Sequence, residues 1–401
     1  MNGQPNIIWI ISTQWRASAM AHTGDPNVRT PWLDGLVSES IYFSQAVTPH
    51  PLGPQARAAF LTGRLCPENG VRDYWDPLPA NSRTIAHALS DRGYTTGFFG
   101  KWHLGKRSRT APLVGEIHAK TIVRQSDRGG FDFWEGFEGG FLINDPWLHG
   151  TRLPSPTLFK GYQPDVLFQR AAQWIDKCKS RPVFCLVSVE TPHPPYHAPS
   201  PFFEKRRMGE IRLLPNVPRG GSVEDQAREE LRGYYAHIEA TDRSIGGFLA
   251  NLDLSNMIVV FTSVHGDMHG AHGLFRKAWP YEESVRIPMI VRHPINRGKG
   301  IDDESMISLV DLPYMTLAWA EGHEWRSKRD NALISMPSAP GIPRQCDRAW
   351  HGFRSSKRKL ILNDDGSPWL YFDLERDPYE MINLVEDRSR LEEIQRSRLL
   401  L

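Results

Sequence analysis

The chain has 401 residues, of which 40% are hydrophobic and 23% are charged, and its formal net charge is +2. This size allows one large domain with a substantial core and a second, smaller one. Both signs of charge are spread along the chain, which argues against a nucleic-acid partner and against a polybasic, membrane-binding surface.

The cysteines and the chain start bear on the compartment. The four cysteines are irregularly spaced and include no CxxC pair, so they predict free thiols rather than a disulfide framework or a zinc site. No basic segment followed by an apolar run opens the chain, and no apolar run reaches the length of a membrane span. These features predict a cytoplasmic protein with no membrane partner.

Apolar runs and amphipathic segments alternate through the first three quarters of the chain. The first run, NIIWIIS at 6–12, is typical of a strand buried on both faces of a parallel sheet. Further strands are predicted at 41–46, 95–99, 182–189 and 257–261, and helices at 82–92, 164–177, 229–252 and 308–320. The pattern predicts an α/β fold with a large mixed, mostly parallel sheet flanked by helices.

The pattern changes near residue 300. Short strand-like segments at 349–362 and 369–374 are separated by the turn signal Asp364-Asp365-Gly366. We therefore predict an α/β domain over 1–300 and a small C-terminal α+β subdomain over 301–401. The subdomain should contain a small antiparallel sheet and a final helix.

Residues 48–64, TPHPLGPQARAAFLTGR, form a Pro-rich loop that leads into an apolar helix starting near residue 58. A loop that feeds a helix N-terminus is a natural anion site, because free N–H groups and the positive end of the helix dipole face the ligand. Arg57 adds a forked cation. The alternative is an ordinary helix start with a solvated arginine.

Polar side chains follow the predicted strands, at the edge where α/β sheets bind ligands. Gln14 follows the first strand, Lys101 and His103 follow the strand at 95–99, and His193 follows the strand at 182–189. They are candidates for one site. For His103, a histidine that only caps a strand end is the alternative reading.

The order of these segments resembles the formylglycine-dependent sulfatases of the alkaline phosphatase superfamily. Their signature reads Cys or Ser, any residue, Pro, any residue, Arg, then a small apolar run and Leu-Thr-Gly-Arg. Here Arg57 and the residues up to 64 match its second half. Other matching segments are GKWHLG at 100–105, PHPP at 192–195, GLFRKAWPYEE at 273–283 and DPYE at 377–380. The resemblance runs from residue 5 to residue 384 and implies the alkaline phosphatase and sulfatase fold.

The resemblance breaks at the nucleophile. Counting back from Arg57, the nucleophile position is Gly53, and no Cys or Ser occurs from 48 to 57. The basic residues that the resemblance implies for catalysis and for sulfate binding are nevertheless present: Arg57, Lys101, His103, His193 and Lys277.

The resemblance also implies a calcium site, and this site is degenerate. Gln14 and His265 match family ligands, but Thr13 and Val264 stand where the family has aspartate. A threonine hydroxyl is a weak ligand and an isopropyl group cannot bind a metal, whereas calcium sites draw on carboxylates. Asp267 lies nearby but does not occupy the ligand position. We expect no cofactor, and calcium only if the residual pair can still bind it.

Without carboxylates the pocket should be net cationic, so the expected partner is an anionic small molecule or a sulfated, sugar-like ligand. Crowded positive charges should also lower the pKa values of the pocket lysines and histidines. The loops at 106–128 and 143–162, with scattered His, Trp and basic residues, are expected at the pocket mouth. The oligomeric state stays open.

These observations predict a sulfatase-like protein without the formylglycine nucleophile, acting as a pseudoenzyme or anion binder. One alternative is a metal-independent enzyme that uses His193, His103 or Lys101 as acid and base. Another is a hydrolase of the sulfatase class, acting on sulfuric or phosphoric esters with residual metal and Thr13 or Thr48 as substitute nucleophile.

Overall fold

A computed structural model describes residues 3–178, 180–296 and 300–401. Among these residues, ten strands form one large sheet in the order β10-β2-β9-β8-β1-β7-β3-β4-β5-β6. Its centre is parallel, because β1 pairs in parallel with both β7 and β8, and β3 pairs in parallel with β7 and β4. The antiparallel pairs involve β9, β5 and β6. The predicted fold class is confirmed.

The strands of the large sheet are β1 (Asn6–Thr13), β2 (Ile41–Val47), β3 (Thr95–Lys101), β4 (Phe133–Phe137), β5 (Trp147–Gly150), β6 (Thr157–Leu158), β7 (Val183–Pro192), β8 (Met257–Ser263), β9 (Met289–Arg292) and β10 (Ile301–Ser308). The helices are α1 (Pro31–Val37), α2 (Gly53–Thr62), α3 (Ile85–Ser90), α4 (Glu116–Ala119), α5 (Gln163–Lys177), α6 (Ser200–Phe203), α7 (Ser222–Ala250), α8 (Glu282–Val285), α9 (Leu312–Ala320) and α10 (Leu391–Arg398).

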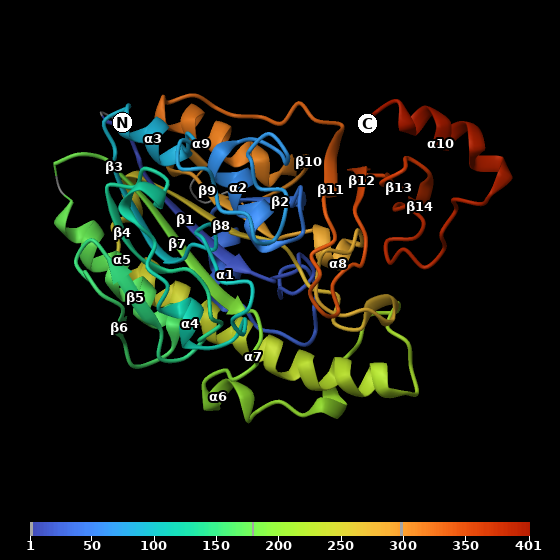
Figure 1. Cartoon of the computed structure of the whole chain (residues 1–401), viewed down its shortest axis with the longest axis horizontal. Helices are drawn as coiled ribbons and strands as arrows, with labels where there is room; N and C mark the ends of the chain where they lie inside the picture. Colours follow the sequence, from blue (N-terminus) through green and yellow to red (C-terminus); the bar gives the residue numbers. More distant parts are fainter. Residues whose placement is uncertain (1–2, 179, 297–299) are drawn as a thin grey trace.

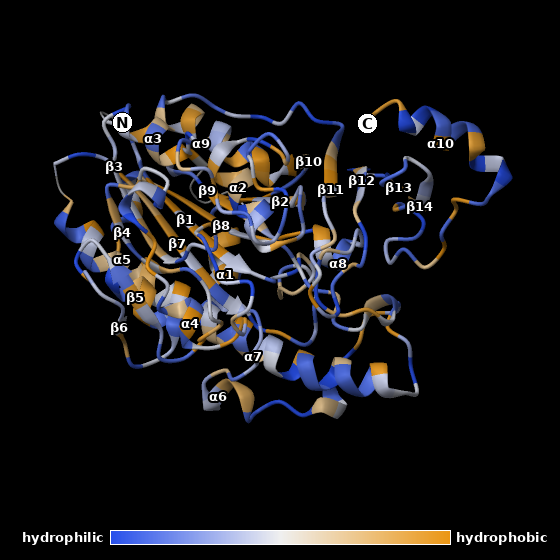
Figure 2. Cartoon of the chain, viewed as in Figure 1, coloured by the Kyte–Doolittle hydropathy of each residue, from blue (hydrophilic) through white to orange (hydrophobic). Residues whose placement is uncertain are grey.

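Helices cover both faces of the large sheet, and alternate residues of β1 show how. Ile7, Trp9 and Ile11 pack in one apolar cluster with residues of α2, α3 and α9. Ile8 and Ile10 belong to a second cluster with residues of α1, α5 and α7. Figure 2 shows the central strands as mainly hydrophobic and much of α7 as hydrophilic. Burial on both faces explains why the strand sequences are continuous apolar runs.

A second, antiparallel sheet follows in the C-terminal part of the chain, shown in orange to red in Figure 1. It consists of β11 (Asn331–Met336), β12 (Trp350–Ser355), β13 (Arg358–Asn363) and β14 (Pro368–Asp373). The last helix, α10, packs on it through Ile394.

The division between the two parts differs from the boundary predicted at residue 300. Strand β10 pairs in parallel with β2, and α9 packs against α2 and α3, so both belong to the large sheet and its helical layer. The small sheet begins only with β11. The reason is that β10 is the edge strand of the large sheet, and the polar, largely exposed first half of its sequence, IDDES, hides its membership.

Two helix starts also differ from the prediction. Helix α2 begins at Gly53 rather than near residue 58, because Pro54 lies in the first turn, where its missing N–H costs no hydrogen bond. Helix α7 begins at Ser222, seven residues before the predicted start at 229.

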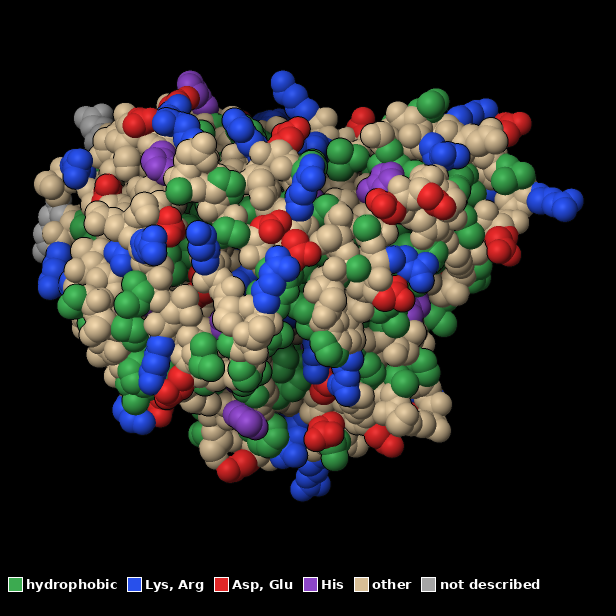
Figure 3. All heavy atoms as spheres, in the orientation of Figure 1, with side chains coloured by type: hydrophobic (Ala, Val, Ile, Leu, Met, Phe, Trp, Pro, Cys, Tyr) green, Lys and Arg blue, Asp and Glu red, His purple; other side chains and the backbone are tan. Residues whose placement is uncertain are grey.

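Across the described residues, we find no helix whose length and apolarity would let it span a bilayer. On the face drawn in Figure 3, acidic and basic side chains are interspersed.

Candidate active site

The predicted site residues meet at the carboxyl ends of the central parallel strands. Thr13 and Lys101 end β1 and β3, and His193 and His265 follow β7 and β8. Gly53, the first residue of α2, faces the same space. Together with His103 and Lys277, these residues line a cavity of about 290 Å³. Neighbouring parallel strands end at one edge of a sheet, which brings these distant residues together.

Two predicted residues lie behind the cavity wall. The Arg57 guanidinium is buried and donates hydrogen bonds to the Lys101 carbonyl (3.0 Å), the Ser188 hydroxyl (2.7 Å) and the Thr13 hydroxyl (3.1 Å). Gln14 is also fully buried. Arg57 therefore links the ends of β1 and β3 to Ser188 within β7.

Gly53 lies so close to the His103 ring that a side chain at position 53 would force a neighbour to move. A Cβ atom added there would lie 2.7 Å from His103 Nδ1 and 2.9 Å from His103 Cε1. The imidazole is held in place because its Nε2 lies 3.2 Å from the Tyr74 hydroxyl and its backbone is in the left-handed region, at φ 59°. The His103 ring thus occupies the volume that any side chain at position 53 would enter.

Lys101 forms a buried ion pair. Its Nζ lies 2.8 Å from Glu190 Oε1, and both side chains are almost fully buried. The same Nζ lies 4.1 Å from the centre of the Phe141 ring. Burial lowers the pKa of Lys101 to about 8, and the Glu190 carboxylate opposes this shift. A carboxylate therefore stands directly behind the cavity floor, contrary to the prediction of a pocket without carboxylates.

Gln14 and Lys277 form the second polar group of the site. Lys277 Nζ donates to Gln14 Oε1 (2.5 Å) and contacts His193 Nε2 (2.9 Å), while the Gln14 amide nitrogen donates to Asp267 Oδ2. Burial lowers the pKa of Lys277 to about 7, and Asp267 opposes this shift. The Gln14 amide is consequently held by a lysine on one side and by an aspartate on the other.

The pKa values of the three cavity histidines, His103, His193 and His265, are all well below their usual range. The direction agrees with the prediction, but the first cause is burial, and the nearby cations come second. At neutral pH these rings are uncharged. His193 Nδ1 lies 2.6 Å from the Pro194 carbonyl, which leaves Nε2 as the side of the ring that faces Lys277.

The residues present do not fit a calcium ion. The Thr13 hydroxyl donates to the Val189 carbonyl (3.0 Å) and accepts from Arg57, and Val264 is packed in the apolar core. Among the described residues that line the cavity, none is a carboxylate. Of the two ligands that the resemblance implies, Gln14 is already bonded to Lys277 and Asp267, and His265 Nε2 is buried without a hydrogen-bond partner, as is His103 Nδ1 in the same lining. Calcium sites require several oxygen ligands and charge compensation, which this set does not supply.

Comparison with known proteins agrees with this architecture. The family model described as Sulfatase matches residues 5–323. The chain belongs to the sulfatase family.

Two sulfatases are similar to this chain along most of its length. The ulvan-active sulfatase of Formosa agariphila is 31% identical over 95% of this chain and 77% of its own length. The arylsulfatase of Clostridium perfringens is 28% identical over 99% and 94%.

Solved structures show the same fold. A Bacteroides fragilis protein described as a sulfatase superposes with a TM-score of 0.87 at 26% identity, covering 99% of this chain and 94% of that one. A phosphonate monoester hydrolase of Agrobacterium radiobacter superposes with a TM-score of 0.78 at 19% identity, covering 99% and 95%, which shows the shared fold alone.

The cavity of this sulfatase-family chain also contains residues that the sequence reasoning missed. Its lining includes partly or fully exposed apolar residues from two segments far apart in the sequence, Leu113 and Val114 in one and Ile342 and Pro343 in the other. The loop at 106–128 thus contributes two residues to the cavity lining, whereas the loop at 143–162 contributes none to the lining described. The apolar character of 342–343 gives no signal in the sequence, because only the packing of the C-terminal part brings it here.

Phe141 and Glu190 were missed as well. The Phe141 ring stacks on the His193 ring, with centroids 4.3 Å apart and planes 12° from parallel, and so fixes the orientation of that imidazole. Glu190 could have been noticed, because it precedes Thr191-Pro192-His193 at the end of a predicted strand. A carboxylate at a strand end is a candidate partner for a buried lysine.

Proposed function

We propose that this sulfatase-family protein binds a sulfated or otherwise anionic small molecule in its cavity and does not cleave sulfate esters by the formylglycine route. The observation that carries the proposal is the packing of His103 against Gly53. The family's nucleophile position has no side chain, and the volume that a nucleophile would fill is taken by an imidazole ring.

The basic residues around the cavity support anion binding. Lys101, Lys277 and Arg276 all line it, and the last forms an ion pair with Glu230 (2.7 Å) that fixes its direction. A bound sulfate would raise the pKa values of both lysines, because the charged form is favoured next to an anion. The apolar residues of the cavity lining suggest that the ligand carries an apolar portion beside its anionic group.

Named relatives act on or bind sulfated compounds, which agrees with this ligand class. One relative is described as an ulvan-active sulfatase, and a structure that shares the fold contains D-glucosamine-2-N,6-O-disulfate as substrate. For this chain we therefore place sulfated sugars and aryl sulfates among the ligands to test.

A metal-independent enzyme is the second candidate, and the contact between His193 and Lys277 favours it. The His193 Nε2 to Lys277 Nζ distance is 2.9 Å, and both groups have lowered pKa values. Such a pair can exchange a proton near neutral pH. A substitute threonine nucleophile is less well supported, because the Thr13 and Thr48 hydroxyls both donate to backbone carbonyls.

Calorimetry with sodium sulfate, combined with turnover of 4-nitrophenyl sulfate, tests these functions. We expect saturable sulfate binding that weakens at least about tenfold in Lys277→Met, since one charged hydrogen bond contributes about 1.5–3 kcal/mol. Lys160→Met is the matched control, because Lys160 is 78% exposed and lies outside the cavity lining. We expect turnover at the buffer background, with or without a chelator.

Each alternative outcome has a distinct meaning. Turnover that a chelator abolishes would overturn the proposal in favour of a metal-dependent hydrolase. Turnover that survives the chelator and is lost in His193→Ala would support the metal-independent enzyme. Absence of sulfate binding by the folded wild-type protein would refute the anion-binding function.

A further inference from the structure

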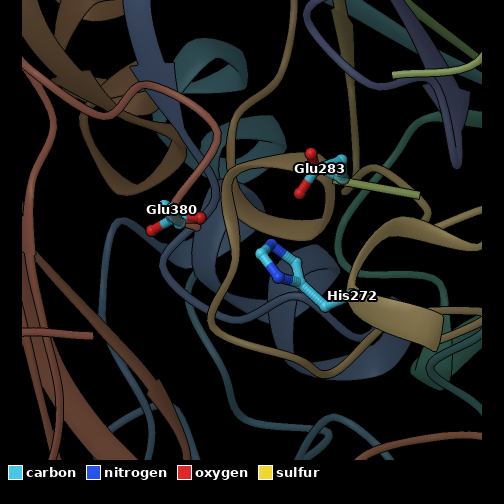
Figure 4. A group of neighbouring side chains, drawn as sticks. All are labelled: His272, Glu283 and Glu380. Carbon is cyan, nitrogen blue, oxygen red and sulfur yellow. The ribbon is translucent and has the colours of Figure 1, made fainter. Parts of the chain in front are cut away.

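A second cluster of possible metal ligands lies away from the cavity, where the C-terminal part of the chain meets the large domain. It consists of His272, Glu283 in α8, and Glu380 in the segment after β14 (Figure 4). One ligand atom from each residue lies within 4.8 Å of the others. Figure 4 shows the three side chains converging on a common space.

The two glutamates are deeply buried, with Glu283 6% and Glu380 3% exposed. Buried carboxylates require compensation by a cation or by several hydrogen bonds. Glu380 has such compensation, because its Oε1 lies 2.6 Å from Lys359 Nζ and its Oε2 accepts from the Glu282 N–H (2.8 Å). Its oxygens retain further lone pairs for a metal.

Glu283 lacks this compensation. Its only hydrogen bond among the described residues is from the Asn216 amide to Oε1 (2.8 Å), and its Oε2 is buried without a partner. No lysine or arginine of the described chain lies within ion-pair distance of it. The neighbouring Glu282, by contrast, contacts Arg354 (3.0 Å) and Lys359 (2.8 Å). Glu283 is therefore a buried carboxylate that has one amide donor and, among the described residues, no Lys or Arg in ion-pair contact.

Asn216 points to the same deficit of positive charge. Its amide nitrogen lies near three acceptors, Glu283 Oε1 (2.8 Å), His272 Nε2 (3.1 Å) and the Tyr379 carbonyl (3.1 Å), although it has only two protons. Its Oδ1 is buried without a partner. Rotation of this amide by half a turn would bring Oδ1 among the acceptors and create a set of oxygen and nitrogen ligands that suits a bound cation.

We propose that this cluster is a zinc site, with His272, Glu283 and Glu380 as ligands and the Asn216 side chain completing the shell. One imidazole nitrogen with two carboxylates is a ligand set that suits Zn²⁺, whereas calcium takes oxygen ligands alone. His272 and Glu283 belong to the large domain and Glu380 to the C-terminal part, so the ion would fasten one to the other. The proposal is independent of the function assigned to the cavity.

Zinc stoichiometry of the full-length protein tests the site. After treatment with a chelator and dialysis, the protein is titrated with zinc chloride by calorimetry, and bound metal is counted by mass spectrometry. We expect one zinc per chain, with affinity at least about a hundredfold lower in Glu283→Gln, because removing a metal ligand costs more than the 10–100-fold of an outer-shell residue. Glu324→Gln is the control, since Glu324 is exposed and outside the cluster.

Two further measurements keep the test decisive. X-ray absorption of the zinc-loaded wild type should show nitrogen and oxygen at about 2.0–2.2 Å and no sulfur at about 2.3 Å, which excludes the free cysteines. His265→Ala should bind zinc like the wild type, which excludes the cavity histidines. Less than one zinc per chain, sulfur ligation, or unchanged affinity in a folded Glu283→Gln protein would each overturn the proposal.

Discussion

The contact between Gly53 and His103 yields the most direct test of the site. Replacing Gly53 by alanine adds a Cβ atom 2.7 Å from His103 Nδ1, closer than carbon and nitrogen atoms pack. Overpacking of a buried site costs about 1–3 kcal/mol. Within a helix the same change would otherwise stabilise by roughly 0.5–1 kcal/mol, because glycine is the more flexible residue. We therefore expect Gly53→Ala to lower the free energy of unfolding by about 1–2 kcal/mol.

Removing the imidazole should reverse the sign of this effect. In a His103→Gly background the clash is absent, and glycine suits the positive φ of 59° at position 103. There, Gly53→Ala should stabilise the protein by roughly 0.5–1 kcal/mol. The double-mutant cycle should thus give a coupling energy of about 1–3 kcal/mol between residues in direct contact.

Urea unfolding of the wild type, both single variants and the double variant measures all four free energies. A Gly53→Ala protein that is as stable as the wild type, or more stable, would refute the steric argument. So would an effect of the same sign and size in both backgrounds. In either case the space beside Gly53 would be open to a side chain, and the main reason for excluding a nucleophile would be lost.

Three further outcomes follow from the buried charges. Lys101→Met should lower the free energy of unfolding by about 3–5 kcal/mol, because Glu190 is left buried without its ion-pair partner. In urea unfolding, the double variant Lys101→Met/Glu190→Gln should recover much of this loss. Equal losses in the single and the double variant would contradict the pairing. Sulfate affinity, measured by calorimetry, should increase as the pH is lowered from about 9 to about 6. The reason is that Lys101 and Lys277 have pKa values of about 8 and about 7 and bind anions when protonated. An affinity that does not change with pH would count against their role. The Glu283→Gln variant lacks the proposed zinc site, so it tests the cavity alone. Calcium chloride at about 1 mM should leave its melting temperature unchanged, because the described lining residues of the cavity include no carboxylate. Saturable calcium binding with a Kd below about 10 µM would contradict this expectation.

The sequence alone predicted the fold class and the edge of the sheet at which the candidate site residues lie. Continuous apolar runs such as residues 6–12 mark strands that are buried on both faces, and polar residues after such strands share one sheet edge. Because both rules act locally, Lys101 and His193 could be placed at that edge without coordinates, whereas His265 was assigned through the resemblance to the sulfatases. The absence of Cys and Ser from residues 48–57, on which the proposed loss of the nucleophile rests, was equally plain from the order of residues.

Only the tertiary structure decided what surrounds those residues. The pairing of Lys101 with Glu190, the apolar lining near residue 342, the membership of β10 in the large sheet and the meeting of His272, Glu283 and Glu380 all join segments far apart in the chain. Local patterns carry no information about such contacts, because they depend on how whole elements pack. The charge balance of the site is therefore a property of the fold, whereas the identity of its residues is a property of the sequence.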